Sequence, residues 1–316
     1  MDYKKLKKGD IPVYGTGGYM LSVDKALSYD KDAIGIGRKG TIDKPYILKA
    51  PFWTVDTLFY CIPKDYSNLN FLYGIFQKIN WKRKDESTGV PSLSKTNINS
   101  TVIAVPSIQE QNKIADFLFL INRRIEKQHQ LVEALKSYKR GALNQVFSKV
   151  TQRVPLSEIS EYYSSANTMA SITQVENGEY PIYDASGIVA LIDKYDFSNS
   201  YVAIIKDGSG VGRLQLCQSK SSIIGTLGAI FPKHCTVRYL LAVLQTIDFR
   251  QFTTGMAIPH IYYKDYKNCS IPFPPQEQRN KIEKISTAID FMIDKESRIL
   301  SLLQQQKTSL MQQLFI

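Results

Sequence analysis

Few side chains in this sequence have the type and spacing that catalysis needs. There are three histidines, His129, His234 and His260, and no His-x-x-x-His, Gly-x-Ser-x-Gly or phosphate-binding Walker motif occurs. The four cysteines stand alone without a Cys-x-x-Cys pair, which favours reduced thiols over a zinc site or disulfides. The sequence therefore predicts neither a catalytic residue nor a bound metal.

Two basic turns are candidates for contacts with a ligand. The segments Arg38–Thr41 and Lys206–Gly212, the latter followed by Arg213, each place cations beside glycine between predicted strands. Such a tip can approach a phosphate or the edge of a base, because glycine has no side chain in the way. An ordinary hairpin tip would have the same composition, so both interpretations stay open. The candidate residues are Arg38, Lys39, Thr41, Lys206, Ser209 and Arg213.

A second turn also occurs twice, as Ser87–Lys95 and Thr253–Ile261. Its glycines permit close backbone approach, and its short polar side chains can donate to phosphates or read bases. A turn that closes a domain onto a helix would use glycine and proline equally well. The candidates here are Thr88, Gly89, Ser92, Ser94, Lys95, Thr254, Gly255 and His260.

These turns belong to an internal sequence repeat, in which one unit occurs twice. Gly9–Gly18 returns as Gly178–Gly187 with an offset of 169 positions, since 178 minus 9 is 169. Gln109–Gln111 returns as Gln276–Gln278, at nearly the same offset. Colinear matches of this kind indicate a duplicated unit.

Each copy has a globular part rich in Tyr, Ile, Val and Gly. Runs such as Ala33–Ile36 and Val202–Ile205 predict short strands, and Phe71–Ile79 predicts a helix. The predicted fold class is therefore α+β, with two similar mixed α/β domains.

A long helix with heptad spacing is predicted at the end of each copy. From Ile114 and from Ile282 the apolar positions alternate between steps of three and four residues, which is a coiled-coil pattern. We expect the two helices to pack antiparallel in a pseudo-twofold arrangement. Gln128 and Glu296, at matching places, either fix the register or face solvent. The seam residues singled out are Ile114, Ile121, Ile125, Leu135, Ile282, Ile289, Ile299, Leu303 and Leu310, and the same spacing includes Ile285, Met292 and Gln306.

The net charge of +11 is concentrated in the first half of the chain. Residues 1–150 carry 24 basic and 14 acidic residues, a net charge of +10, whereas 151–316 carry 16 and 15, a net charge of +1. A basic half favours a polyanionic partner, nucleic acid first, although solvated surface charge would give the same count. The sequence contains no apolar run long enough for a membrane span and no signal peptide at its basic start, so we expect a cytoplasmic location and no membrane partner.

The order of these motifs resembles the specificity subunits of type I restriction–modification systems. The resemblance rests on a Pro-x-Tyr-x-x-x-Gly strand and turn at Pro12–Gly18, the Thr-Gly-containing turns, and the Gln-Glu-Gln openings of the long helices after Pro106 and Pro274, all occurring twice. It covers nearly the whole chain.

The resemblance implies two target recognition domains that each read one half of a split sequence in double-stranded DNA, with spacer helices that set the gap. It also implies methyltransferase subunits, two of them, docked on the helices, and restriction subunits joined through these. S-adenosylmethionine would bind the methyltransferase, ATP and magnesium the restriction subunit, and no cofactor this chain. The expected domains are 1–106 and 149–273 for recognition, and 107–148 and 274–316 for the spacer helices.

One departure from the family pattern concerns the first recognition domain. Residues 149–177 precede Gly178 in the second copy, whereas only 1–8 precede Gly9, so the first domain is expected to be shortened at its N-terminal side. Two other functions fit the residues themselves. One is a stand-alone dimeric DNA-binding regulator, and the other is a coiled-coil scaffold whose globular heads bind protein.

Overall fold

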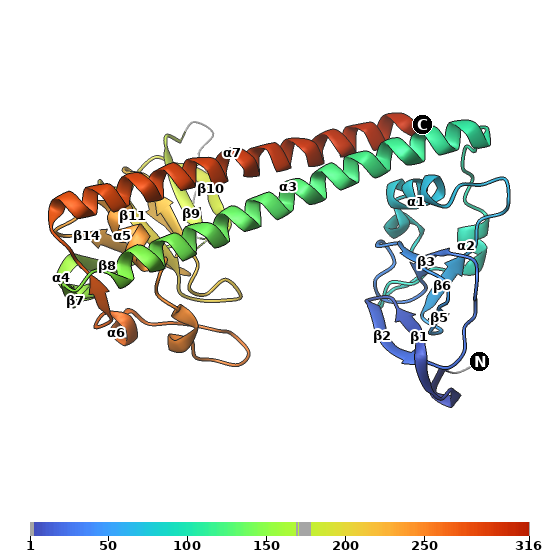
Figure 1. Cartoon of the computed structure of the whole chain (residues 1–316), viewed down its shortest axis with the longest axis horizontal. Helices are drawn as coiled ribbons and strands as arrows, with labels where there is room; N and C mark the ends of the chain where they lie inside the picture. Colours follow the sequence, from blue (N-terminus) through green and yellow to red (C-terminus); the bar gives the residue numbers. More distant parts are fainter. Residues whose placement is uncertain (1–2, 169, 171–177, 316) are drawn as a thin grey trace. The chain divides into compact units, whose positions relative to one another are not determined.

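The computed structural model describes residues 3–168, 170 and 178–315. Their contacts divide the chain into two units (Figure 1): unit 1 comprises 1–130 with 298–316, and unit 2 comprises 131–297. Two long helices, α3 (Ile108–Ser148) and α7 (Gln276–Leu314), contribute a segment to each unit.

The globular part of unit 1 is built on two three-stranded sheets, with strand orders β2-β1-β5 and β4-β3-β6. All five residues of the central strand β3 are buried, which explains its uninterrupted small and apolar sequence Ala-Ile-Gly-Ile-Gly. The elements are η1 (Tyr3–Lys5), β1 (Lys8–Gly15), β2 (Gly18–Val23), β3 (Ala33–Gly37), β4 (Tyr46–Leu48), β5 (Trp53–Thr54), β6 (Leu58–Cys61), α1 (Leu69–Lys78), η2 (Trp81–Lys84) and α2 (Lys95–Asn99).

Unit 2 repeats this plan and adds to it. Its sheets have the orders β10-β9-β13, β12-β11-β14-β8 and β15-β7. The elements are β7 (Arg153–Pro155), α4 (Leu156–Ile159), β8 (Ser160–Ser164), β9 (Tyr180–Asp184), β10 (Gly187–Ile192), β11 (Tyr201–Ile205), β12 (Leu214–Cys217), β13 (Ser222–Ile223), β14 (Leu227–Pro232), α5 (Val237–Leu244), η4 (Phe249–Phe252), α6 (Tyr263–Tyr266) and β15 (Ser270–Pro272).

The sequence repeat is therefore a structural repeat. Sheet β2-β1-β5 corresponds to β10-β9-β13, and β4-β3-β6 corresponds to β12-β11-β14. Gly9 and Gly178 also play the same part, because a Cβ at either would lie 2.5 Å or 2.6 Å from backbone atoms of the neighbouring strand. The prediction of two similar mixed α/β domains with two long helices is confirmed. In the described part of unit 1, nothing corresponds to β7, α4 and β8.

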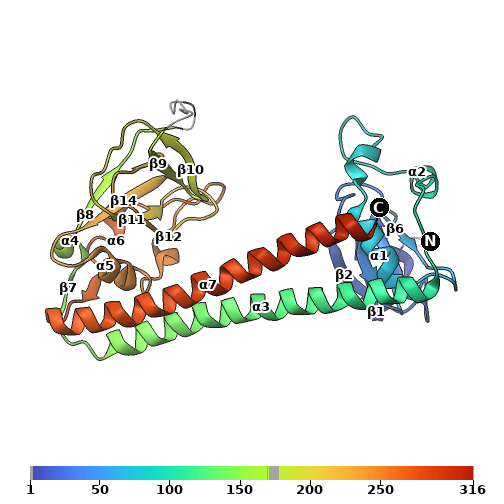
Figure 2. The ribbon, with the colours of Figure 1, turned by 90° about the horizontal axis from the view of Figure 1, so that it is seen from above.

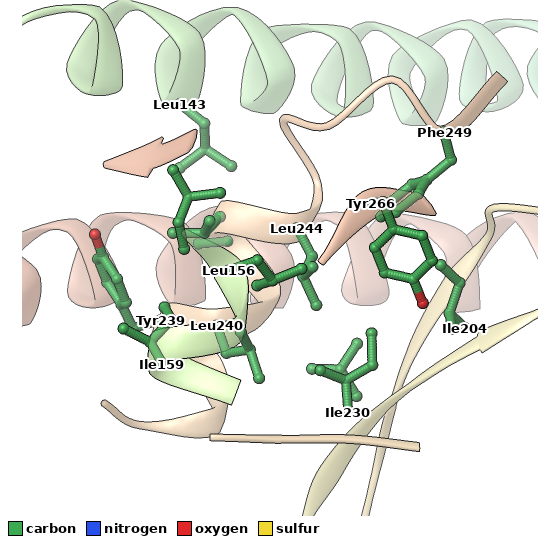
Figure 3. Packing of buried hydrophobic residues seen from close by; sticks show 14 of the residues in the cluster. Leu143, Leu156, Ile159, Ile204, Ile230, Tyr239, Leu240, Leu244, Phe249 and Tyr266 are labelled. Carbon is green, nitrogen blue, oxygen red and sulfur yellow. The ribbon is translucent and has the colours of Figure 1, made fainter. Parts of the chain in front are cut away.

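The main core of unit 2 lies between its larger sheet, α4, α5 and the end of α3 (Figure 3). Leu156 and Ile159 of α4 are 0% and 1% exposed, and they pack beside Tyr239 and Leu240 of α5. The Tyr239 hydroxyl donates a hydrogen bond of 2.8 Å to the carbonyl of Pro272, so this large side chain is buried without an unsatisfied polar group.

The phenylalanine that ends each long helix has a packing role. Phe147 of α3 contacts Tyr239 with ring centroids 6.1 Å apart, and Phe315 contacts Phe71 at 5.4 Å. Gly74 in α1 makes room for the second contact, because a Cβ there would lie 2.7 Å from Cζ of Phe315. The closing phenylalanine therefore joins α3 to α5 in unit 2 and the end of α7 to α1 in unit 1.

Within each unit, segments of α3 and α7 lie side by side and run in opposite directions (Figures 1 and 2). In α3 the shielded positions continue the predicted pattern, from half-buried Ile114 and Ile121 to buried Val132. The predicted seam residues are buried in the case of Ile282, Ile289 and Leu303, and half-buried in the case of Ile114, Ile121, Ile125, Leu135, Ile299 and Leu310.

Three positions of the predicted α7 seam are wrong by one residue. Ile285 and Met292 are 48% and 50% exposed, and Gln306 is exposed as well. The shielded positions are instead the next residues along, Ser286, Ile293 and Lys307. A heptad pattern allows the seam residue after Ile282 to lie either three or four positions further along the helix. Because Ser286, at the four-residue step, is polar, the sequence favoured the apolar Ile285 instead.

The seam also contains a buried cation, Lys139, four residues after Leu135. Its Nζ lies 2.6 Å and 2.7 Å from the two carboxylate oxygens of Asp290 in α7. The Lys139 side chain is 6% exposed and that of Asp290 is 32% exposed. This ion pair links the two helices inside unit 2 and satisfies a charge that would otherwise be buried alone.

We expect Asp290→Ala to lower the free energy of unfolding by about 2 kcal/mol, because it leaves the Lys139 ammonium buried without a partner. The partial exposure of Asp290 keeps this loss below that expected for a fully buried ion pair. Lys139→Met should cost less, since it keeps the apolar stem and leaves only a half-exposed carboxylate. Urea denaturation followed by circular dichroism measures both. Equal losses for the two variants would contradict this account.

Candidate nucleic-acid interface

In unit 1, the two predicted ligand-contacting turns are adjacent in space. The Gly40 amide donates to the carbonyl of Pro91 at 2.8 Å, and the Leu93 amide donates to the carbonyl of Arg38 at 2.9 Å. Lys39 and Ser92 form an antiparallel bridge between these two bonds. The basic turn and the Thr-Gly turn therefore form one surface, which we call the paired-turn tip (38–41 with 87–95).

Unit 2 builds its paired-turn tip (206–213 with 253–261) from the same main-chain links. The Gly208 amide donates to Pro259 at 2.9 Å, the Ile261 amide donates to Lys206 at 2.9 Å, and Asp207 bridges with His260. Gly40 and Gly208 both have positive φ, 88° and 96°, which few other residues adopt. This correspondence matches Arg38 with Lys206 and Lys39 with Asp207.

The unit 1 tip presents its cations to solvent. Arg38, Lys39 and Lys95 are exposed, and Thr41 is half-buried. The Arg38 guanidinium lies 5.8 Å from the ring centroid of Phe59 and donates at 3.4 Å to the carbonyl of Asp56, so its direction is partly fixed. An exposed, oriented cation on a turn is suited to a phosphate or a base edge.

The unit 2 tip is closer to neutral. Nζ of Lys206 lies 2.9 Å from the carboxylate of Asp207, and the lysine side chain is only 25% exposed. Arg213 is exposed but donates to the carbonyl of Ala185 at 3.2 Å, and Ser209 is also exposed. The difference in charge between the two halves of the sequence is therefore also found between the two tips, and the unit 1 tip is the more basic one.

A carboxylate organises the second turn of unit 1. Oδ1 of Asp85 accepts hydrogen bonds from the amides of Ser92 and Ser87, at 2.9 Å and 3.0 Å, and from the Ser87 hydroxyl at 2.8 Å. These donors, with the Ser92 amide first, hold the pKa of Asp85 below its ordinary value. Thr88 and Gly89 are left exposed at the end of the turn.

Ser94 has a structural task that its sequence position did not reveal. Its hydroxyl caps α2 by accepting from the Asn97 amide at 3.1 Å, and it lies 3.2 Å from Oε1 of Glu86, to which it donates. Ser92 is half-buried between the two turns. Any contact of these two residues with a ligand stays a prediction.

In unit 2 the second turn is closed by its own backbone. Thr254 and His260 exchange amide–carbonyl bonds of 2.9 Å and 2.8 Å, and the His260 ring lies 5.1 Å from that of Tyr262. Gly255 has φ of 88°, and a Cβ there would lie 2.4 Å from the Ile258 carbonyl oxygen. Gly89, its counterpart by sequence, meets nothing within 4 Å, so the two turns differ in shape.

The apolar side chains of these turns were not among the residues predicted from the sequence. Val90 is 67% exposed in unit 1, and Met256 and Ile258 are 105% and 67% exposed in unit 2. Apolar groups beside exposed cations are suited to thymine methyl groups and sugars. An apolar residue next to Thr-Gly in a surface turn is the sequence pattern that could have predicted these exposed side chains.

Asp85→Ala should accelerate amide hydrogen exchange at Ser87 and Ser92, because both amides would have no acceptor. Since the pKa of Asp85 is lowered in the folded chain, its contribution is complete above the ordinary carboxyl pKa and disappears as the pH falls through the lowered value. Exchange measured by mass spectrometry tests this, with Asp30→Ala as the control. Unchanged exchange in Asp85→Ala would remove this role.

Within the described ranges, no three His, Cys, Asp or Glu residues are placed to hold a metal ion. Burial raises the pKa of Cys235 to about 11, which keeps that thiol protonated and unreactive at neutral pH. Among the described residues, no helix has both the length and the apolar character that crossing a membrane requires.

Comparison with known proteins places this repeat in a family. The model of the type I restriction modification DNA specificity domain matches twice, over 2–137 and over 149–305. The chain belongs to this family. The resemblance found in the sequence is thereby confirmed, and the two matched stretches are the two copies of the specificity domain.

Individual relatives are more distant. The chain is 25% identical over 175 residues to the type I restriction enzyme MjaVIII specificity subunit of Methanocaldococcus jannaschii, a match that spans 51% of this chain and 41% of the relative. The crystal structure of the S subunit from M. genitalium has the same fold, with a TM-score of 0.62 and 16% identity over 100% of this chain and 91% of that one. A chain from a study of complex assembly and conformational transition in the type I system gives a TM-score of 0.55 and 14% identity over 99% and 93%.

Proposed function

We propose that this chain is the DNA-recognition subunit of a type I restriction–modification complex, and that it selects the DNA sequence without catalysing a reaction itself. One observation carries the proposal: the specificity-domain family matches twice, and each matched stretch contains a paired-turn tip with the same main-chain links. Such a complex acts on chromosomal and invading DNA, so we place the chain in the cytoplasm.

Each tip reads one half of a split sequence in this proposal. Arg38 and Lys39 contact phosphates or base edges beside unit 1, while Arg213 and the neutralised Lys206–Asp207 pair face the other half. The tips differ in charge and in the shape of their second turns, so the two half-sites differ. Binding through exposed cations weakens as salt concentration rises.

The long helices carry the partner surface. In unit 1 the first part of α3 exposes Phe117, Phe119 and Leu120, at 43%, 58% and 59%. In unit 2 the first part of α7 exposes Phe291 and Met292, at 71% and 50%. Exposed apolar side chains of this size on one element mark protein contacts. We propose that each segment docks one methyltransferase subunit, which carries S-adenosylmethionine, and that restriction subunits with ATP and magnesium join through these.

Phe291→Asp should reduce capture of the methyltransferase subunit by at least about tenfold, because a carboxylate would be buried in an apolar contact. Co-purification from cells that express both chains measures it. Ile188→Asp is the matched control, since Ile188 is exposed in unit 2 but lies on β10, away from α7 in sequence. If the wild-type chain, Phe291→Asp and Ile188→Asp all captured the methyltransferase subunit equally, the docking surface would lie elsewhere.

Mapping of methylated adenines tests the function as a whole. A host that carries this chain with its methyltransferase subunits is compared with a host that carries the methyltransferase subunits alone. A new split, asymmetric motif is the expected result. A symmetric motif would mean that one recognition domain acts in two copies. No new motif, together with DNA binding by the isolated chain at one operator, would favour a stand-alone regulator instead.

A further inference from the structure

The ion pair in the seam of unit 2 has an equivalent in unit 1 that lacks the acidic partner. The closing phenylalanines of the two long helices are 168 positions apart, since 315 minus 147 is 168. The same offset relates Lys139 of α3 to Lys307 of α7, and it relates Asn122 of α3 to Asp290 of α7. A neutral carboxamide therefore stands in unit 1 where unit 2 has the carboxylate that neutralises its seam lysine.

The Lys307 charge has no partner in the described part of the chain. Its side chain is half-buried in the seam, and no described residue forms a hydrogen bond or an ion pair with it. Burial away from water lowers the pKa of Lys307 below its ordinary value. Lys139, by contrast, has both carboxylate oxygens of Asp290 within 2.7 Å. A half-buried cation without such a partner is a place where an anion would be stabilised.

Lys307 lines an open pocket of unit 1, which we call the Lys307 pocket. Its volume is about 560 Å³, and its walls come from α3, α7 and the end of α1, which lie together in unit 1 (Figures 1 and 2). Lys307, Asn122 and Lys78 line it, and the lining, all of it described, has no Asp or Glu. Lys78 donates to the carbonyl of Phe315, which is a neutral acceptor. Three glutamines and a threonine add uncharged hydrogen-bond donors, so the pocket has the chemistry of an anion site.

We propose that the Lys307 pocket binds a carboxylate side chain of a partner protein. The inference rests on the proposed function, because the partner is the methyltransferase subunit that docks on the first part of α3. The exposed side chains of Phe119 and Leu120 come just before Asn122 on that helix. A subunit seated on them lies beside the pocket and can insert an Asp or Glu side chain into it.

The chain itself shows why a protein carboxylate fits better than a phosphate of DNA. The equivalent lysine in unit 2 takes a carboxylate through both oxygens, and the pocket offers the same ammonium group with amide donors around it. The exposed apolar side chains next to the pocket are typical of protein contacts. Phosphates are contacted chiefly by exposed cations, as at the unit 1 tip, whereas Lys307 is half-buried.

The first test restores the missing carboxylate in the isolated full-length chain. Asn122→Asp should raise the midpoint of thermal unfolding, because the new carboxylate would pair with Lys307 as Asp290 pairs with Lys139. The same substitution in a Lys307→Met background should give no such gain, and Lys307→Met alone should not lower the midpoint. Scanning calorimetry of the wild-type chain, both single variants and the double variant measures these effects. If Asn122→Asp raised the midpoint equally in both backgrounds, Lys307 would not be open to a carboxylate, which overturns the inference.

The second test measures binding of the methyltransferase subunit to the full-length chain by biolayer interferometry. Asn122→Asp and Lys307→Met should each weaken binding by at least about tenfold, chiefly through faster dissociation, because one neutralises the pocket and the other removes its cation. Lys25→Met is the matched control. Lys25 is exposed after β2 and outside the pocket, so the loss of this charge should leave binding unchanged.

The outcomes separate this inference from the proposed function. If the wild-type chain and the Asn122→Asp and Lys307→Met variants bound the subunit equally well, the inference would be overturned and the proposed function would stand. Failure of the wild-type chain to bind the subunit would overturn both. Weaker binding together with a lower thermal midpoint in Lys307→Met would show a purely structural role, and weaker DNA binding with unchanged subunit binding would assign the pocket to a phosphate. Either result overturns the inference.

Discussion

The double replacement of Arg38 and Lys39 by alanine should weaken binding of duplex DNA by roughly tenfold to a hundredfold. It should also reduce the slope of log K against log salt concentration by about one for each phosphate that these cations neutralise. Both side chains are exposed on the unit 1 tip, where Arg38 is oriented by Phe59 and by the carbonyl of Asp56. The measurement is a salt titration of the chain in complex with its methyltransferase subunits.

The control for this experiment removes the same charge elsewhere. Lys25 and Lys64 are exposed in unit 1 and lie outside both turns of the tip. Their double replacement by alanine changes the net charge equally, so a similar loss of affinity would mean that only overall charge matters. An unchanged salt slope in the Arg38 and Lys39 variant would exclude this tip from the DNA interface.

Phe147→Ala is expected to cost about 3–5 kcal/mol of folding free energy, because it removes a phenyl ring from a close-packed core. Phe147 is 4% exposed and packs against Tyr239, which is 1% exposed. Phe315→Ala, the equivalent change in unit 1, should cost only about 1–2 kcal/mol of folding free energy, since Phe315 is half-buried and lines a pocket of unit 1.

Calorimetry of the two single variants and of the wild-type chain separates these effects. Phe119→Ala, at a residue 58% exposed on α3, serves as the control and should change the stability by less than about 0.5 kcal/mol. If Phe147→Ala and Phe315→Ala destabilised the chain equally, the pocket in unit 1 would be as well filled as the core in unit 2.

The parts of the fold that the sequence could predict are those with a periodic or repeated signal. The duplication, the long helices and most of their buried faces follow from spacing alone, as at Ile282 and Ile289. The slip at Ile285 and Met292 has a physical origin, because a buried face on a helix admits either a three-step or a four-step neighbour.

The candidate interface shows a different limit. The four turns were recognised from their glycines and prolines, but the backbone bonds that join Gly40 to Pro91 and Gly208 to Pro259 link residues about fifty positions apart, and no local pattern contains them. The same bonds match Lys39 with Asp207 across the repeat, so the two tips carry different charges at one equivalent position.

The links inside each paired-turn tip consist of main-chain atoms alone. Apart from Gly40 and Gly208, whose positive φ restricts what can replace them, the bonded residues contribute amides and carbonyls that almost any side chain would also present. Substitutions at the positions of Arg38, Lys39 and Ser92 can therefore alter what the tip touches while its framework stays folded. A surface built in this way can acquire new targets one residue at a time, with stability and selectivity evolving almost independently.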